Sequence, residues 1–229
     1  MAKIVAEISG NHGGDLEKAR EMIFQASKAG ADLVKFQFYR PEDMPDAEFE
    51  ENYAMYKRLM VPDEWLGRIF RAAKGCHVPL FASVFSVRAV ETLKKFDVPF
   101  FKLASPDSTK LSQKTYLDIL AAAYPIDVIV SGPSRYKIEG YFGIKTLLYP
   151  MYCPPGHPPT ITQEMLDYFE NNGFYGFSDH TPGIQAPLAF LRRGAKMIEK
   201  HFKLDDDCID ADFSADFDTM ATLCRYAHT

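Results

Sequence analysis

Eight short segments rich in β-branched and aromatic residues recur along the chain, and amphipathic stretches separate most of them. This alternation is typical of parallel strands joined by crossover helices. Eight such strands close into a (β/α)8 TIM barrel, which takes about 200–250 residues. We therefore predict this α/β fold, with residues 1–229 as a single domain. The predicted strands are Lys3–Ile8, Leu33–Tyr39, Pro79–Val84, Phe100–Ala104, Asp127–Ser131, Ile144–Tyr149, Phe174–Phe177 and Lys196–Phe202.

Amphipathic periodicity predicts helices between several of these strands. The segment Asp15–Gly30 places its apolar residues on one helical face, with Asp15 as the N-cap and Gly30 as the C-terminal stop. Three further segments have a similar pattern, namely Val61–Ala73, Val87–Phe96 and Thr162–Asn172.

Three connections depart from this pattern. Ser134–Gly143 contains two glycines and is too short for an ordinary helix of about 11 residues, so we predict a shortened connector after strand five. Arg40–Tyr53 and Cys153–Pro159 are rich in proline and are predicted to be loops that cover one mouth of the barrel. A homodimer is one way in which that cover could be completed.

Charge and composition exclude several classes of function. The net charge of -5 argues against sequence-independent nucleic-acid binding, which requires clustered lysine and arginine. The four cysteines lack C-x-x-C spacing and are interpreted as reduced thiols. The sequence shows no signal peptide and no apolar run near the roughly 20 residues that span a bilayer. We predict a cytoplasmic protein that does not contact membranes.

Polar residues gather where the predicted strands end, at the rim where barrel active sites are built. Strand alternation places Lys35 and Gln37 on one side of their strand, and Glu199 and His201 on one side of theirs. A buried lysine requires a carboxylate, a phosphate or water nearby. Lys35 and Lys102 therefore indicate either an anionic ligand or a structural network with Glu7 and Glu199, and the residues alone leave both interpretations open.

Two histidines end adjacent predicted strands. His180 and His201 would lie within reach of one ion, and imidazole binds several divalent cations. Two protein ligands leave coordination positions open, which suits Lewis-acid catalysis better than a closed structural role. His77, His157 and His228 lack comparable context and are expected to be exposed or packed.

Several ordered motifs extend over nearly the whole chain, and they resemble the catalytic barrel of the sialic acid (N-acetylneuraminate) synthase family. Members of that family condense phosphoenolpyruvate with N-acylated amino sugars. The motifs are Ala6-Glu7-Ile8 with Asn11-His12-Gly13-Gly14-Asp15, Gly30-Ala31-Asp32-Leu33-Val34-Lys35-Phe36-Gln37, Phe101-Lys102-Leu103-Ala104-Ser105, Gly176-Phe177-Ser178-Asp179-His180-Thr181, and Gly194-Ala195-Lys196-Met197-Ile198-Glu199-Lys200-His201-Phe202.

The resemblance implies a role for each strand-end residue. His180 and His201 would hold a divalent ion, usually Mn²⁺ with Mg²⁺ or Co²⁺ as alternatives, that binds the aldehyde oxygen of the sugar. Asp107 stands where the family carries a glutamate suited to activating water, and Glu7 and Glu199 would handle protons, sugar hydroxyls or the orientation of the histidines. Asp210 would contact the sugar. The implied phosphoenolpyruvate pocket and its surroundings comprise Lys35, Gln37, Ser83, Phe85, Lys102, Ser105, Ser131 and Ser178.

Other features differ from the family pattern. Members usually continue into a small antifreeze-like domain that contacts the sugar, whereas this sequence ends at Thr229. The sixth strand carries Leu148-Tyr149-Pro150-Met151-Tyr152-Cys153 in place of Leu-His-Cys, and Asp212 stands where a lysine is usual. Two alternatives are therefore a synthase or aldolase that uses another aldehyde, and a barrel that binds a sugar or partner without turnover.

Overall fold

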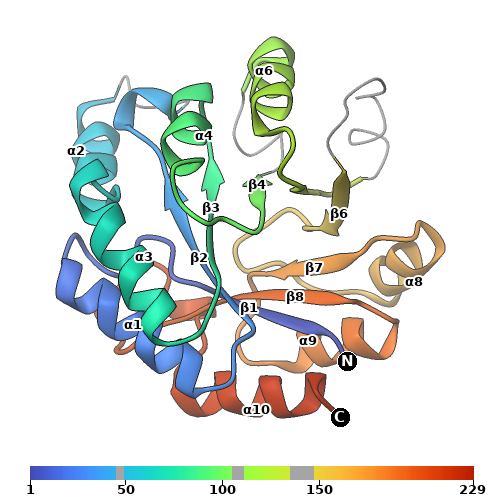
Figure 1. Cartoon of the computed structure of the whole chain (residues 1–229). Helices are drawn as coiled ribbons and strands as arrows, with labels where there is room; N and C mark the ends of the chain where they lie inside the picture. The colour runs from blue at the N-terminus through green and yellow to red at the C-terminus, as the bar shows by residue number, and fades with distance from the viewer. Residues whose placement is uncertain (45–48, 105–110, 135–146) are drawn as a thin grey trace.

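Eight parallel strands close into a barrel in chain order, β1 to β8, so the predicted TIM barrel is confirmed (Figure 1). The computed structural model describes residues 1–44, 49–104, 111–134 and 147–229. The strands are β1 Lys3–Glu7, β2 Leu33–Phe38, β3 Leu80–Val84, β4 Phe101–Leu103, β5 Val128–Gly132, β6 Leu148–Tyr152, β7 Gly176–Asp179 and β8 Met197–His201.

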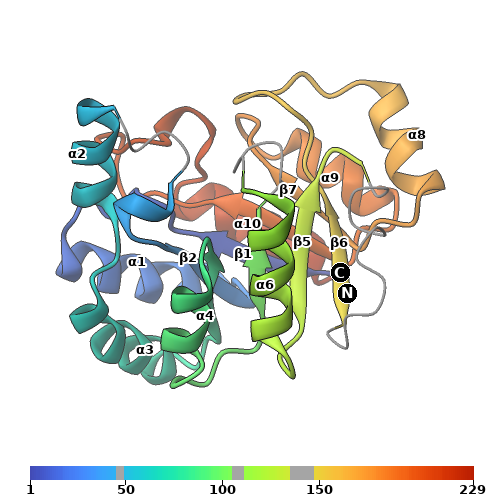
Figure 2. The same cartoon turned by 90° about the horizontal axis from the view of Figure 1, so that it is seen from above.

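Helices surround the barrel (Figures 1 and 2). They are α1 Leu16–Lys28, α2 Glu50–Leu59, α3 Leu66–Gly75, α4 Val87–Leu93, α6 Gln113–Ala123, α8 Gln163–Asn171, α9 Gln185–Arg192 and α10 Phe217–Ala227, with short 3-10 helices at Pro41–Asp43, Asp63–Trp65 and Ala211–Phe213. The predicted N-cap of α1 is confirmed, because the Asp15 side chain accepts hydrogen bonds from the backbone N–H groups of Glu17 and Lys18. In the described part of the chain, no helix is long and apolar enough to cross a membrane.

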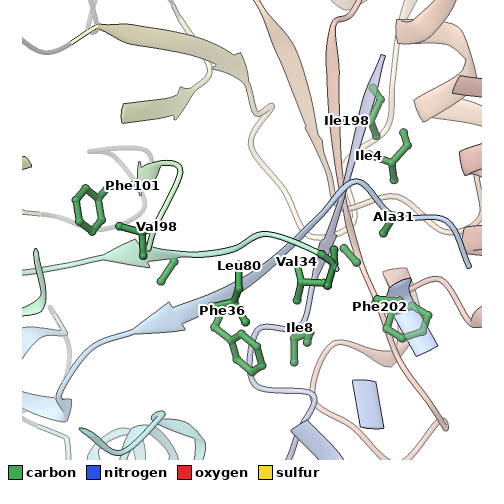
Figure 3. Packing of buried hydrophobic residues seen from close by; sticks show 14 of the residues in the cluster. Ile4, Ile8, Ala31, Val34, Phe36, Leu80, Val98, Phe101, Ile198 and Phe202 are labelled. Carbon is green, nitrogen blue, oxygen red and sulfur yellow. The ribbon is translucent and has the colours of Figure 1, made fainter. Parts of the chain in front are cut away.

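The main apolar core lies between the outer face of the barrel and the helices. Figure 3 shows part of this core, including Ile4 of β1, Val34 and Phe36 of β2 and Ile198 of β8. Full burial of an aliphatic or aromatic side chain of this size stabilises a fold by about 1.5–3 kcal/mol. The chain ends meet on this surface, since the Ala2 N–H donates to the Ala227 carbonyl at 3.1 Å, and both termini lie together in Figure 2.

A separate apolar cluster forms the floor of the barrel interior. It consists of Val5, Leu33, Phe81, Ile129, Met151 and Met197, each from a different strand. Side chains alternate along a strand, so the residue two positions further on also faces the interior, one layer nearer the C-terminal rim. On three of these strands that residue is Glu7, Lys35 or Glu199. The strand alternation thus places a layer of buried charge directly above an apolar floor.

Two predicted strands are displaced along the chain. The sixth was expected at Ile144–Tyr149 but is Leu148–Tyr152, and the seventh was expected at Phe174–Phe177 but is Gly176–Asp179. Pro150 looked like a strand border because proline has no N–H. It is accommodated because pairing with β7 begins one residue later, at Met151, while the Pro150 carbonyl accepts from the Tyr175 N–H at 2.7 Å.

The predicted loop Arg40–Tyr53 is partly helical. It includes the 3-10 helix Pro41–Asp43 and the first residues of α2, a helix that the sequence reasoning missed. The helix was missed because its N-terminal turn is acidic and follows two prolines, a composition that also fits a surface loop. The predicted shortened connector Ser134–Gly143 falls almost wholly in 135–146, outside the described residues.

Candidate active site at the carboxyl ends of the strands

Two lysines and two glutamates meet inside the barrel above the apolar floor. Lys35 of β2 forms an ion pair with Glu7 of β1, and Lys102 of β4 forms one with Glu199 of β8 at 2.5 Å. Lys35 also lies 3.7 Å from Glu199, so the pairs form one connected cluster. All four side chains are buried, with at most 4% of any one exposed. The ion-pair network of the two lysines with the two glutamates, one of the two interpretations left open by the sequence, is therefore present.

Serine hydroxyls surround the same charges. Lys35 donates to Ser83 Oγ at 2.9 Å, Lys102 donates to Ser178 Oγ at 3.2 Å, and Ser178 donates to Glu199 Oε1 at 3.0 Å. Ser131 of β5 is also buried in this layer. Within the described residues, Glu199 Oε2 is buried without a hydrogen-bond partner. A buried acceptor of this kind costs about 1–3 kcal/mol, which a ligand or water could offset by donating to it.

The pKa values of Lys35 and Glu199 are both lowered, which disfavours the charged form of the lysine and favours that of the glutamate. Burial lowers the pKa of Lys35 to about 7, although Glu199 acts to raise it. Burial alone would raise the pKa of Glu199, but Lys102 and Lys35 lower it to about 2. Glu199 is therefore ionised at neutral pH, while the charge on Lys35 depends on the anions around it.

The two predicted metal-binding histidines lie together at the rim. Strands β7 and β8 pair in parallel with Asp179 opposite Lys200, which places His180 and His201 in equivalent positions immediately after that pair. Their ring centroids are 5.0 Å apart. Burial, followed by the nearby His201 and His157, lowers the pKa of His180 to about 2. The His180 ring is therefore neutral at physiological pH, the form that can bind a metal.

Asp210 reaches the second histidine from the loop after β8. Its Oδ2 atom lies 3.0 Å from His201 Nδ1, close enough for charge interaction but without the alignment of a hydrogen bond. Burial acts to raise the pKa of Asp210, but its contacts with His201, Ser9 and His157 together lower it below the usual value. The loop is held in place by Asn11, whose side chain accepts from the Asp210 N–H at 3.0 Å and donates to Ser214 Oγ at 2.9 Å.

Comparison with known proteins identifies the family to which this arrangement belongs. The model of the NeuB family matches residues 22–135 and 159–229. This chain belongs to the NeuB family. It is 31% identical to a pseudaminic acid synthase of Campylobacter jejuni, across 96% of this chain and 71% of that protein. It is 29% identical to the N-acetylneuraminate-9-phosphate synthase of Homo sapiens, across 97% of this chain and 68% of that protein.

A solved structure places the same family on the same fold. The N-acetylneuraminic acid synthetase of Leptospira borgpetersenii superposes with a TM-score of 0.88 at 28% sequence identity, covering 99% of this chain and 82% of that one. The resemblance to sialic acid synthases stated from the motifs is confirmed by these comparisons.

Residues of the loop after β6 also lie beside the histidine pair. The His157 ring lies 4.3 Å from the His180 ring, and Cys153 Sγ lies 3.9 Å from His180 Nδ1. Phe213, in the loop after β8, packs against both His180 and His201, with centroid distances of 5.5 Å and 4.9 Å. His157 is exposed, as expected, but its position beside His180 was not predicted. Its place in a loop predicted to cover the barrel mouth was the signal that could have found it.

The remaining predicted site residues lie at the rim or outside the described residues. Gln37 donates to Ser9 Oγ at 3.2 Å, beside the loop that follows β1. Phe85 is buried after β3, where its ring packs against Tyr39 at 5.7 Å. Ser105 and Asp107 fall in 105–110, outside the residues that the structure describes.

The histidine pair fits a divalent cation that keeps most of its coordination sphere open. The described residues contain no group of three or more histidine, cysteine or acidic side chains arranged as a ready metal cage. They do contain two neighbouring imidazoles, of which His180 is held neutral, and a carboxylate 3.0 Å from His201. Two imidazole ligands with open positions correspond to a catalytic rather than a structural metal site.

Proposed function

We propose that this NeuB-family protein condenses phosphoenolpyruvate with the aldehyde of an open-chain N-acylated amino sugar or related aldose. The products would be a nonulosonic, sialic-acid-like 2-keto-3-deoxy acid and phosphate. The observation that carries the proposal is the placement of Lys35, Lys102 and Glu199 in one buried layer directly below His180 and His201. An anion-binding layer and a cation-binding pair thus occupy the same end of one barrel.

The phosphoenolpyruvate site would be the lysine and serine layer. A lysine ammonium has three N–H donors. Among the described residues, Lys102 uses two of them, on Ser178 and Glu199, so one remains for a phosphate or carboxylate oxygen. Ser83 and Ser131 add hydroxyl donors around the same space. Even with both lysines protonated, the two glutamates leave the described cluster without net positive charge, so the negative charge that phosphoenolpyruvate brings requires further positive charge nearby.

A divalent cation at His180 and His201 supplies that charge when bound and polarises the aldehyde carbonyl. We propose Mn²⁺ as this ion, as the family resemblance implies. The protein's own contribution is to keep His180 neutral through burial, and to hold His201 beside Asp210. We assign Asp210 to the orientation of His201 as well as to the sugar, because carboxylates that contact a metal-binding histidine fix its ring.

The condensation joins C3 of phosphoenolpyruvate to the aldehyde carbon, and water then adds at C2 before phosphate leaves. A carboxylate must accept the proton of that water. Glu199 is ionised at neutral pH and has a free buried oxygen, so it can accept a proton or a substrate hydroxyl at Oε2. Glu7 would keep Lys35 in place, and Asp107 remains a candidate for the water.

The acceptor side supports a second candidate, in which the aldehyde differs from an N-acylated amino sugar. Cys153 and His157 approach His180 from the loop after β6, next to the strand whose sequence departs from the family pattern. An acceptor bound at the histidine pair would meet these side chains first. A smaller or differently substituted aldehyde is therefore the alternative that this observation favours.

The test is phosphate release from phosphoenolpyruvate with Mn²⁺ and a panel of aldehydes, with the product identified by mass spectrometry. We expect release with N-acylated hexosamines and loss of at least about 10²-fold in His180→Ala, since metal-site electrostatics supply several kcal/mol. His77→Asn is the matched control, because His77 is exposed in a turn with positive φ that asparagine tolerates. Release only with small unacylated aldehydes would favour the second candidate, and no release with any aldehyde would contradict both.

A further inference from the structure

A further lysine–carboxylate pair, Lys200 with Asp179, lies on the outer face of β7 and β8, the strands that lead to His180 and His201. Lys200 follows Glu199 on β8 and therefore points away from the barrel interior. Its Nζ donates to Asp179 Oδ2 at 2.6 Å and to the carbonyl of Thr181. Both charged side chains are fully buried, with 0% of each exposed. The site described above makes no use of this pair.

The ion pair lies directly next to both histidines along the chain. Asp179 immediately precedes His180, Lys200 immediately precedes His201, and the two are opposite each other in the β7–β8 register. Strands β7 and β8 lie side by side in Figure 1. Asp179 Oδ1 also accepts the Thr181 N–H at 3.0 Å and the Thr181 hydroxyl at 2.8 Å. The residues on both sides of His180 are thus tied to each other and to the strand that carries His201.

We propose that Asp179, Lys200 and Thr181 form a clasp that positions His180 and His201 for metal binding. Lys200 and its partner Asp179 lie outside the barrel interior, so we treat the three as positioning residues and not as metal ligands. The inference rests on the proposed function, because it assumes that the histidine pair binds a divalent cation.

Energetics favour positioning over simple stabilisation. Removing two charges from water costs several kcal/mol per ion, and apolar residues of similar volume often stabilise a fold as well as a buried ion pair does. The ion pair instead adds direction, because each of its bonds fixes an angle as well as a distance. Here four such bonds converge on the three-residue segment from Asp179 to Thr181. That segment carries His180 at its centre.

The test separates metal binding from stability in Asp179→Asn, Lys200→Met and the double variant. Mn²⁺ affinity is measured by electron paramagnetic resonance of the free ion, and the visible spectrum of bound Co²⁺ reports the geometry of the site. Each single variant leaves one buried charge unpaired and should be destabilised, whereas the double variant should regain much of that stability. We expect Mn²⁺ affinity to fall by about 10-fold or more in all three variants, as for other residues that orient metal ligands. The Co²⁺ spectrum should change as well.

Two further variants keep the result interpretable. Thr181→Val removes the hydroxyl bond to Asp179 and preserves shape, so it should fold and still weaken Mn²⁺ binding by a few-fold. Leu93→Ala empties a buried position on α4 and should lower stability without changing Mn²⁺ affinity.

Wild-type Mn²⁺ affinity in the double variant and in Thr181→Val would overturn the clasp while leaving the proposed function intact. Absence of Mn²⁺ binding to the wild-type protein would overturn both.

Discussion

Each face of β8 carries a buried lysine–carboxylate pair, but the two pairs differ in how fully their polar atoms are hydrogen-bonded. On the inner face, Glu199 binds Lys102 and lies near Lys35, yet its Oε2 atom is buried without a partner among the described residues. On the outer face, Lys200 binds Asp179, and both oxygens of that carboxylate accept hydrogen bonds. One system has capacity left for a ligand and the other is complete.

The pKa shifts of the two carboxylates follow the same division. Burial acts to raise the pKa of both, but two lysines lower that of Glu199 to about 2. Lys200 and the hydrogen bonds from Thr181 act to lower the pKa of Asp179, but burial keeps it above the usual value. Neither burial nor pairing by itself therefore distinguishes a binding site from a structural bracket. What distinguishes them is whether the polar atoms are already satisfied.

The largest expected effect comes from replacing the inner lysine. Lys102→Met removes the donor that the proposed reaction needs for phosphate or carboxylate charge, so we expect phosphate release to fall by about 10³-fold, or about 4 kcal/mol of transition-state stabilisation. Steady-state kinetics measure this loss, with the exposed Lys95→Met as the control. Activity within 10-fold of the wild type would show that the inner cluster is structural.

The corresponding lysine-to-methionine substitution on the outer face should mainly lower stability. Lys200→Met leaves Asp179 buried without its partner, and breaking one side of such a pair costs about 3–5 kcal/mol of unfolding free energy. Urea denaturation of the two variants measures the contrast. The comparison fails if Lys102→Met is the less stable of the two, because the inner glutamate keeps Lys35 at 3.7 Å and should tolerate the change better.

Much of this arrangement could be predicted from the sequence, because the strand period is two. Because Lys35 and Glu199 are predicted in buried strands, alternation places Gln37 on the same strand face as Lys35, and His201 on the same strand face as Glu199. The strand order then determined that His180 and His201 would be neighbours. The number of strands, the N-cap of α1 and the buried charge layer follow from such local rules.

The sequence could not predict contacts that depend on loop paths. His157 and Asp210 reach the histidines from connections with no regular period, and only the folded chain brings them there. The predicted position of β6 was too early in the chain because Pro150 looked like the end of a strand. Its missing N–H falls before the pairing with β7, so the strand continues through it. The clasp was also missed, since alternation places Lys200 outside the barrel without showing that Asp179 lies opposite it.

A smaller effect is expected at a carboxylate remote from both systems. The Asp15 side chain caps α1, and Asp15→Ala should lower the unfolding free energy by about 1 kcal/mol. Because this residue is exposed on the outer helix layer, phosphate release should be unchanged at temperatures where the variant is folded. The variant thus measures how much stability the site can lose without consequence. A parallel fall in activity would mean that the losses in the other variants reflect unfolding.

The smallest effect concerns a third paired carboxylate, near the chain ends. Asp32 accepts from Lys3 Nζ at 2.9 Å and the Ile4 N–H at 2.8 Å, and lies 2.9 Å from His228 Nε2. Burial acts to raise its pKa, but these three contacts lower it below the usual value.

A carboxylate with a lowered folded-state pKa contributes stability above its unfolded pKa of about 3.9, and that contribution is lost as the pH falls through the folded value. We therefore expect Asp32→Asn to show a shallower decline in unfolding free energy below about pH 4 than the wild type, by less than about 1 kcal/mol because the pair is partly solvated. Urea unfolding at pH 3 and pH 6 measures the difference. An equal decline in both proteins would show that the contacts of Asp32 do not contribute to the acid sensitivity of this barrel.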